Sequence, residues 1–334
     1  MTMILTRARV ILIALVLCSV AGTLYATHDL WQSAGAITTA SHQALYQLRL
    51  SRLRQSNSLA DVRGEMSYRI EDACDGWNVA QRFNLQFVYS DQPSALETSD
   101  YNTYESKDGQ HYQFSTRHQR NGQITDEILG KAERNGPLGD GVIDYERPKT
   151  AQAKLGADVL FPTQHTLHIL QEALAGKQWF TAPLFDGSDL SLANDVNVFA
   201  TRVNKPYIAE VKEIMPLEKT PVDDADDAAP VPEESTAPQP MTVEQLNANP
   251  LIANTRAWRI RMAFYPRQDA IQTEDQKSAD LSPEDDPANA VTPDYEMTMV
   301  LHSNGVVSSF TLDYPDFSLD ANLLSIAEVA KNSC

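Results

Sequence analysis

The strongest constraint on the fold is a repeated alternation of apolar and polar side chains. In residues 81–89, QRFNLQFVY, every second side chain is large and apolar: Phe83, Leu85, Phe87 and Tyr89. Because side chains of a strand point alternately to its two faces, this pattern predicts a strand with one apolar face. The same period recurs over residues 46–50, 66–70, 258–264 and 295–301. Such a chain must form a sheet that buries one face.

Three dipeptides predict how these strands are connected. Asp108-Gly109, Asn121-Gly122 and Asn304-Gly305 stand between alternating runs. Such pairs accept the positive φ angles of tight hairpin turns. The chain is therefore expected to form a mainly β, antiparallel meander. Periodicity leaves open whether the sheet is flat, closed or curled.

One segment has helical spacing instead. FPTQHTLHILQEALAGKQWF, residues 161–180, places Leu167, Leu170 and Leu174 on one helical face. Thr163 is the expected N-cap and Gly176 the expected stop, so the pattern predicts an inserted α-helix over 163–176. A second apolar run, residues 323–330, predicts a short C-terminal helical segment. Both could simply pack on the core, or the first helix could close a cavity.

The N-terminus has the layout of a secretory signal peptide. Arg7 and Arg9 precede an apolar run over residues 10–20, and small residues follow up to Ala26. The run is about half the ~20 residues that a membrane-spanning helix needs. Cleavage could follow Ala21 or Ala26; we expect it after Ala26, which clears the whole apolar run, and we expect export to the periplasm.

Export changes the interpretation of the cysteines. Loss of residues 1–26 removes Cys18 and leaves Cys74 and the last residue, Cys334. In an oxidising compartment, two cysteines are most simply one disulfide. A zinc site would need four close ligands, and a nucleophilic Cys74 would need a base beside it rather than Asp75.

The net charge of −18 is concentrated in two tracts. Residues 221–240 carry six acids and no base, and residues 269–293 carry seven acids and Lys277. Both are rich in proline and alanine, which predicts disordered insertions at about 217–250 and 268–293. A calcium site at the paired aspartates lacks a glycine turn and regular ligand spacing. The acidity excludes a nucleic-acid partner, because nothing would neutralise phosphates.

No catalytic motif is present. His165 and His168 could share a metal on a helix, but no third ligand is near in sequence, so no metal and no cofactor are expected. Trp77, Trp179 and Trp258 could form a sugar-stacking platform, although aromatic residues on strands usually belong to the core. We therefore expect a protein that is not an enzyme.

Several segments resemble the EipB family of cell-envelope integrity proteins. These are SHQALYQLRLSRLR (41–54), GEMSYRIEDACDGWNVAQRF (64–83), LFPTQHTLHILQEALAGKQWF (160–180) and the terminal cysteine. The resemblance covers about residues 40–215 and 255–334. It implies a periplasmic β-spiral or open β-barrel as a single domain over residues 27–334, with one helix plugging one side. It also implies a Cys74–Cys334 disulfide, a role in envelope integrity and a link to a periplasmic tetratricopeptide-repeat protein.

Two binding hypotheses follow. In the first, an open sheet edge or an outer face docks a periplasmic protein partner. In the second, the curled sheet encloses an apolar groove for a lipid or a lipidated peptide. That groove would be lined by Phe83, Phe87, Trp258 and Phe264, with Leu167, Leu170 and Leu174 as its lid.

Overall fold

The computed structural model describes residues 37–54, 58–136, 139–190, 193–204, 239–267, 292–330 and 334. The chain divides after Thr38, and everything below concerns the unit Thr39–Cys334. The expected signal peptide, residues 217–238 of the first acidic insertion and residues 268–291 of the second lie outside the described residues.

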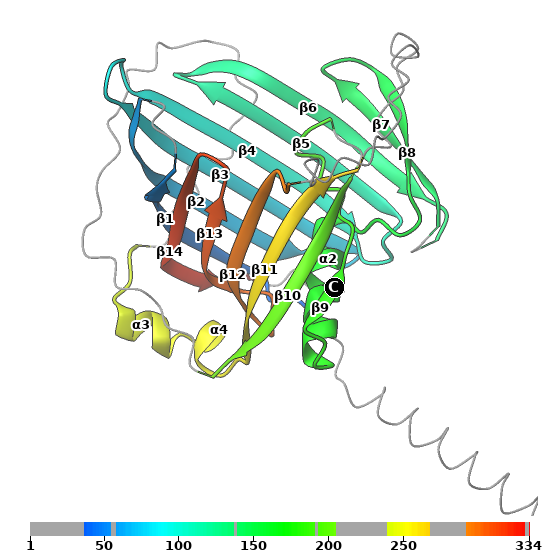
Figure 1. The fold of residues 1–334 in the computed structure, drawn as a ribbon. Coiled ribbons are helices and arrows are strands. Elements are labelled where there is room, and N and C mark those ends of the chain that lie inside the picture. The colour runs from blue at the N-terminus through cyan, green and yellow to red at the C-terminus, as the bar shows by residue number, and fades with distance from the viewer. Residues whose placement is uncertain are drawn as a thin grey trace, which may run out of the picture. The chain divides into compact units, whose positions relative to one another are not determined.

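The core of the unit is a single 14-stranded antiparallel sheet (Figure 1). Its order is β8-β7-β6-β5-β4-β3-β2-β1-β14-β13-β12-β11-β10-β9, so the chain forms a meander from β1 to β8 and returns to the far side of β1. The strands are β1 His42–Leu53, β2 Leu59–Asp72, β3 Gly76–Tyr89, β4 Ala95–Ser106, β5 His111–Arg120, β6 Gln123–Arg134, β7 Gly141–Arg147, β8 Ala151–Leu155, β9 Trp179–Thr181, β10 Asn194–Val203, β11 Ala257–Pro266, β12 Tyr295–His302, β13 Val307–Asp313 and β14 Phe317–Glu328.

The edge strands β8 and β9 are consecutive in the chain but do not pair with each other. The sheet therefore curls without closing, which confirms the expected open barrel. The predicted turns are also confirmed. Asn121 and Gly122 have φ angles of 51° and 80°, and Gly109 and Gly305 have 69° and 82°. These positive values suit the hairpins that join β4 to β5, β5 to β6 and β12 to β13.

Helix α2, Pro162–Leu174, connects the two sheet edges. It begins one residue earlier than expected, because Pro162 occupies the first helical position and Thr163 lies buried inside the first turn rather than capping it. Proline suits this position because its missing N–H would have no partner within the helix. Gly176, with φ 84°, follows the helix at the expected stop.

The expected C-terminal helical segment at 323–330 is wrong. Residues 323–328 are the end of β14, and Leu323 pairs with Tyr46 of β1 while Ile326 pairs with Ala44. Leu323, Leu324 and Ile326 are 1%, 3% and 2% exposed, respectively. Both faces of this strand end are buried, so its apolar residues run continuously and imitate helical spacing.

Two short helices cover this end of β14 and account for its burial. They also show that the first disordered insertion was predicted to extend too far. Residues 243–250, expected to be disordered, form helix α3, Val243–Ala248, and the start of helix α4, Pro250–Ala253. Thr242 and Gln245 form a capping box at α3. Asn249 donates a side-chain hydrogen bond to the carbonyl of Ile326 in β14, at 3.2 Å. The short helices therefore pack against the end of β14, the segment whose apolar run had predicted a helix.

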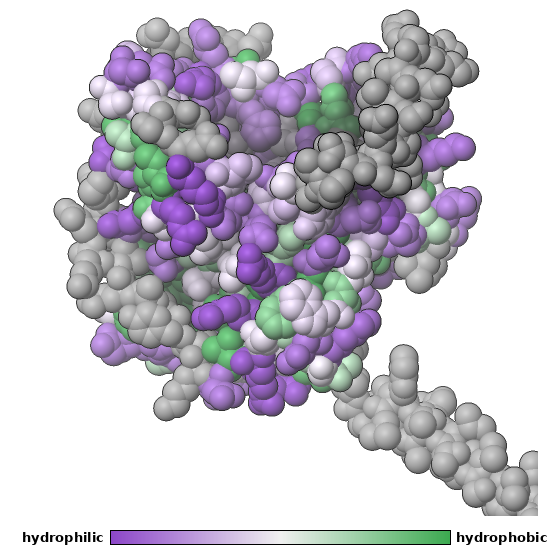
Figure 2. All heavy atoms as spheres, in the orientation of Figure 1, coloured by the Kyte–Doolittle hydropathy of each residue, from purple (hydrophilic) through white to green (hydrophobic). Residues whose placement is uncertain are grey.

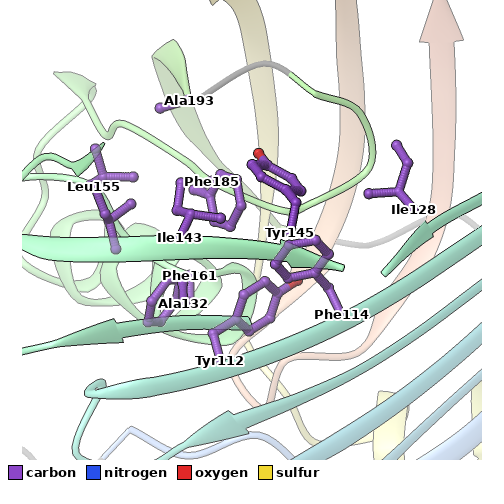
Figure 3. Close-up of a cluster of buried hydrophobic side chains, with 11 residues drawn as sticks. Tyr112, Phe114, Ile128, Ala132, Ile143, Tyr145, Leu155, Phe161, Phe185 and Ala193 are labelled. Carbon is purple, nitrogen blue, oxygen red and sulfur yellow. The ribbon is translucent and has the colours of Figure 1, made fainter. Parts of the chain in front are cut away.

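The inner face of β5–β8 carries the clearest hydrophobic cluster (Figure 3). Its members are Tyr112, Phe114, Ile128, Ala132, Ile143, Tyr145, Leu155, Val159, Phe161, Phe185 and Ala193. Phe161, which precedes α2, stacks on Tyr112 with ring centroids 4.8 Å apart. Phe185 contacts Tyr112 and Phe114 edge-on. This cluster attaches the start of α2 and the segment after β9 to the inside of the sheet.

Candidate functional site

A disulfide joins an early hairpin to the end of the chain. Cys74 lies in the turn between β2 and β3 and is bonded to Cys334, with Cα atoms 5.8 Å apart and a sequence separation of 260. Asp72 holds this turn, because its carboxylate accepts hydrogen bonds from the Cys74 N–H at 2.9 Å and from Lys107 Nζ at 2.7 Å. The covalent loop therefore encloses every strand from β3 to β14.

A carboxylate from the sheet caps α2. Phe161, the N-cap residue, makes no side-chain cap, but Glu105 of β4 accepts hydrogen bonds from the backbone N–H groups of Thr163 at 2.6 Å and Gln164 at 2.8 Å. A negative group suits the positive end of a helix. Glu105 is 1% exposed, however, and burial raises its pKa to about 7 despite these two bonds. The helix is thus attached through a buried, ionisable group.

Arg134 of β6 supports the same attachment from the other side. Its guanidinium donates a hydrogen bond to the carbonyl of Val159 at 2.7 Å and lies over the ring of Phe161 at 4.5 Å. Its positive charge also favours the ionised form of Glu105, although burial of the carboxyl has the larger effect on the pKa of Glu105. Arg134 therefore fixes the two residues that lead into α2.

The segment after β9 fills this part of the interior. The carbonyl of Asp186 accepts hydrogen bonds from the hydroxyls of Tyr112, at 2.7 Å, and Tyr101. Thr116 donates to the carbonyl of Gly187 at 3.2 Å. Because these partners lie on the inner faces of β4 and β5, the segment closes the interior beside α2 with satisfied polar groups.

An aromatic chain follows the opposite part of the inner face. Phe264 stacks on Tyr295 at 4.3 Å between centroids, and contacts continue through Tyr314 and Phe317 to Phe87, at 5.9, 5.2 and 6.1 Å. Phe264 is buried, whereas the other four are partly exposed. We call these five residues the aromatic rim. It is an apolar surface that reaches solvent inside the curl of the sheet.

The residues predicted to line a groove share the inner face, but they do not form one open groove. Phe83 and Phe87 are partly exposed, whereas Trp258 and Phe264 are 5% and 3% exposed. On the helix, Leu170 is fully buried, and Leu167 and Leu174 are half-buried. Of the seven, only Phe87 and Phe264 belong to the aromatic rim.

The helical histidines have structural roles. His165 is buried, and its Nε2 lies 3.0 Å from the carbonyl of Ala182, while burial lowers its pKa to about 4. His168 contacts Phe180 of β9 edge-on. Among the described residues, no group of three or more His, Cys, Asp or Glu is arranged to hold a metal ion. None of the described helices is long and apolar enough to span a membrane.

Sequence reasoning missed Glu105, although a signal was available. The alternation that places Tyr101 on the inner face of β4 also places Glu105 there, opposite Trp77 in the register with β3. A carboxylate at an inward position of an apolar face must have buried partners. The pattern alone could not identify those partners, because they lie 58 and 59 residues away in α2.

The sequence and the fold are both similar to those of known proteins. The EipB-like family model matches residues 33–222 and 228–330. The Cell envelope integrity protein EipB of Brucella abortus is 23% identical over 305 residues, which cover 90% of this chain and 89% of that protein. A crystal structure of a beta-barrel-like protein of the domain of unknown function DUF1849 from Brucella abortus superposes with a TM-score of 0.66 and 20% identity, covering 88% of this chain and 100% of that chain. The chain belongs to the EipB-like family.

Proposed function

We propose that the protein is exported to the periplasm and supports cell-envelope integrity as a non-enzymatic module that binds a protein partner. Its relative from Brucella abortus is named for cell-envelope integrity. The observation that carries the binding mode is the edge of β8, the first strand of an unclosed sheet, which pairs with no strand beyond it among the described residues. A free strand edge presents backbone N–H and C=O groups that an extended peptide can pair with.

The charge around this edge specifies the partner. Lys149 and Lys154 are exposed on or beside β8, and the outward Gln152 donates a hydrogen bond to Asp144 at 2.8 Å. An extended segment carrying acids therefore fits the edge. The opposite edge, β9, spans only Trp179–Thr181, so it offers a much shorter template. The first partner to test is a periplasmic tetratricopeptide-repeat protein, the class that the family resemblance implies.

Proline substitutions at neighbouring positions test the edge. Along a strand, successive backbone N–H groups point alternately to the neighbouring strand on one side and on the other. One of Gln152→Pro and Ala153→Pro therefore removes an N–H that points to the open edge, and the other removes an N–H that bonds to β7. The tolerated variant is identified by an unchanged melting temperature. Lys154→Glu leaves the backbone intact and cancels the positive charge that Lys149 and Lys154 give this edge.

The readout combines envelope sensitivity with cross-linking. A host lacking the gene should become sensitive to deoxycholate, and the wild-type protein should restore resistance. The stable proline variant and Lys154→Glu should not restore resistance. A photoreactive residue at position 154 should cross-link to the partner. One at Gln113 should not, because Gln113 lies on the outer face of β5, which has neighbouring strands on both sides. Full complementation by the stable proline variant contradicts docking at β8, and normal resistance of the deletion strain contradicts the envelope role.

A lipid or lipopeptide carrier is the second candidate, favoured by the partly exposed aromatic rim. Native mass spectrometry of protein purified gently from its host tests it. A carrier should show added mass that disappears on denaturation. That mass should be lost in Phe87→Ser, on the inner face, and kept in Val88→Ser, its neighbour on the outer face. A ligand-free wild-type protein contradicts the carrier function.

A further inference from the structure

Of the three tryptophans that the structure describes, one is exposed, on the outer face of the sheet. Trp179 of β9 is 68% exposed, whereas Trp77 and Trp258 are 6% and 5% exposed. Its ring stacks on Phe199 of β10 with centroids 4.1 Å apart and an interplanar angle of 28°. Phe199 therefore holds one face of the indole, and the exposed remainder is a rigid aromatic platform. Tryptophan is enriched at interfaces because its ring gives a large apolar contact while its N–H can still form a hydrogen bond.

Beside this platform the outer face is hollowed. One cavity of about 300 Å³ is lined by Phe199, Thr201, Arg259, Arg261, Glu296, Thr298 and Asp313. A second cavity of about 260 Å³ shares Arg259 and Thr298 with the first and extends past Thr311 to Asp320. We call the two together the outer trough. Figure 2 shows mainly hydrophilic residues over this side of the molecule, where β10–β14 face the viewer.

The register explains the shape of the outer trough. Phe199 pairs with Arg261, Arg261 with Thr298, and Thr298 with Thr311. Short threonine side chains on the central strands therefore lie between longer side chains on the strands around them. The result is a polar floor of hydroxyl groups with an aromatic platform at one end.

The charged side chains of the outer trough differ in whether they have a bonding partner. Glu296 accepts a hydrogen bond from Arg261 Nη2 at 2.7 Å, and Asp313 accepts from Arg54 Nη2 at 2.5 Å. Asp320 accepts from the Thr311 hydroxyl at 2.8 Å. The guanidinium of Arg259, in contrast, has no hydrogen-bond or ion-pair partner among the residues that the structure describes. Arg259 is therefore a cation that the trough leaves without an ion-pair partner, and Asp320, at the far end of the second cavity, is a carboxylate without a cationic partner among the described residues.

We propose that the outer trough binds an acidic saccharide. A sugar ring stacks on Trp179, its carboxylate pairs with Arg259, and hydroxyl groups bond to Thr298 and its neighbours. The platform and Arg259 stand two strands apart, about 10 Å, so they contact different sugar units of one chain. A lipid would need an enclosed apolar wall, which this hydroxyl floor lacks. The site is independent of the proposed docking at β8, which lies at the other end of the strand order.

Isothermal titration calorimetry on the whole mature protein tests this site. The acidic probes are peptide-free glycan strands of N-acetylglucosamine and N-acetylmuramic acid, and hyaluronan tetrasaccharide. Chitotetraose is the neutral probe. We expect binding of at least one acidic probe and about tenfold weaker binding of chitotetraose, because the charge-assisted bond to Arg259 is absent. A preference for one acidic probe identifies which carboxylate the site accepts.

Variants assign the binding to the outer trough. Trp179→Ala and Arg259→Gln should each weaken binding of the acidic probe by about tenfold or more. Arg202→Gln removes an exposed charge from the neighbouring strand β10 at a position registered with the inward Trp258, and should leave binding unchanged. All three side chains are exposed, so melting temperatures should match the wild type. Absence of binding to both acidic probes, equal binding of chitotetraose, or unchanged binding in either trough variant overturns the proposal.

Discussion

Replacing Glu105 with glutamine tests which force controls the attachment of α2. Glutamine keeps the size of the side chain, and its amide oxygen still accepts a hydrogen bond from the N–H of Thr163 or Gln164. The substitution removes the ability to ionise and one of the two acceptor oxygens, and only the first of these losses changes with pH across the range tested. Two forces compete at this carboxyl, because the helix N-terminus and Arg134 favour the charge while burial opposes it.

The expected magnitude follows from the pKa. Burial raises the pKa of Glu105 from 4.5 to about 7, so the folded protein holds this proton more tightly than the unfolded chain. The associated stabilisation is complete below pH 4.5 and is lost as the pH rises through about 7. This gap between the two pKa values corresponds to about 3 kcal/mol of unfolding free energy.

The wild-type pH profile alone cannot isolate this effect. Burial lowers the pKa of His165 and of His302 from 6.5 to about 4. Their neutral forms stabilise the fold above pH 6.5, and this contribution is lost as the pH falls through about 4. The histidine and glutamate effects therefore have opposite signs over overlapping ranges. The difference between variant and wild type cancels the histidine contribution.

Urea unfolding at a series of pH values from about 4 to about 8 measures that difference. We expect the stability of Glu105→Gln relative to wild type to rise by about 3 kcal/mol across this range. Glu97→Gln is the control on the same strand, because its carboxylate pairs with Arg120 and is 31% exposed. Either a constant difference or one that falls with pH would refute the reasoning: the first would show that the helix N-terminus and Arg134 balance burial, and the second that they outweigh it.

Four further substitutions, one of them a control, test the packing. Cys334→Ser should lower the unfolding free energy in urea by about 2–5 kcal/mol, because it opens a loop of 260 residues; an unchanged melting temperature after reduction of the wild type would contradict this. Gly187→Ala and Gly176→Ala both place a side chain at positive φ, 69° and 84°, but only at Gly187 would the new Cβ lie 2.5 Å from the ring of Phe114. Gly187→Ala should therefore be the more destabilising in thermal melts, and equal losses would count against the contact. Phe161→Ala should cost about 3–5 kcal/mol in urea unfolding, since it removes a fully buried ring; a loss below about 1 kcal/mol would mean that the cluster is not packed as described.

The alternating pattern predicted the strands well because strand periodicity is a local property. The run from Phe83 to Phe87 lies on one face of β3, and the Asn121-Gly122 turn forms where the sequence placed it. The errors occurred where a second layer changed the pattern. Residues 323–330 looked helical because both faces of the end of β14 are covered. The capping box at Thr242 was overlooked inside a polar, proline-rich stretch.

For the candidate sites, the sequence supplied residue types but could not supply partners. Trp77, Trp179 and Trp258 all lie on strands, and the usual assignment to the core is correct for two of them. Trp179 differs because it lies on the outer face of β9, the last strand at this edge of the sheet among the described residues. Arg259 and Thr298 become neighbours only through the pairing of β11 with β12, two strands separated by residues 267–294.

The sequence by itself determined that the chain forms one-sided antiparallel strands with one long helix between them, because alternation, turn dipeptides and helical spacing depend on neighbours a few residues apart. Only the tertiary structure decided that β1 pairs with β14, that β8 and β9 remain apart, and that Glu105 of β4 caps α2. These features depend on contacts between residues far apart in the chain, whose formation is governed by packing and loop closure across the whole sheet. The unpaired edge, the aromatic rim and the outer trough all arise from that second set of contacts.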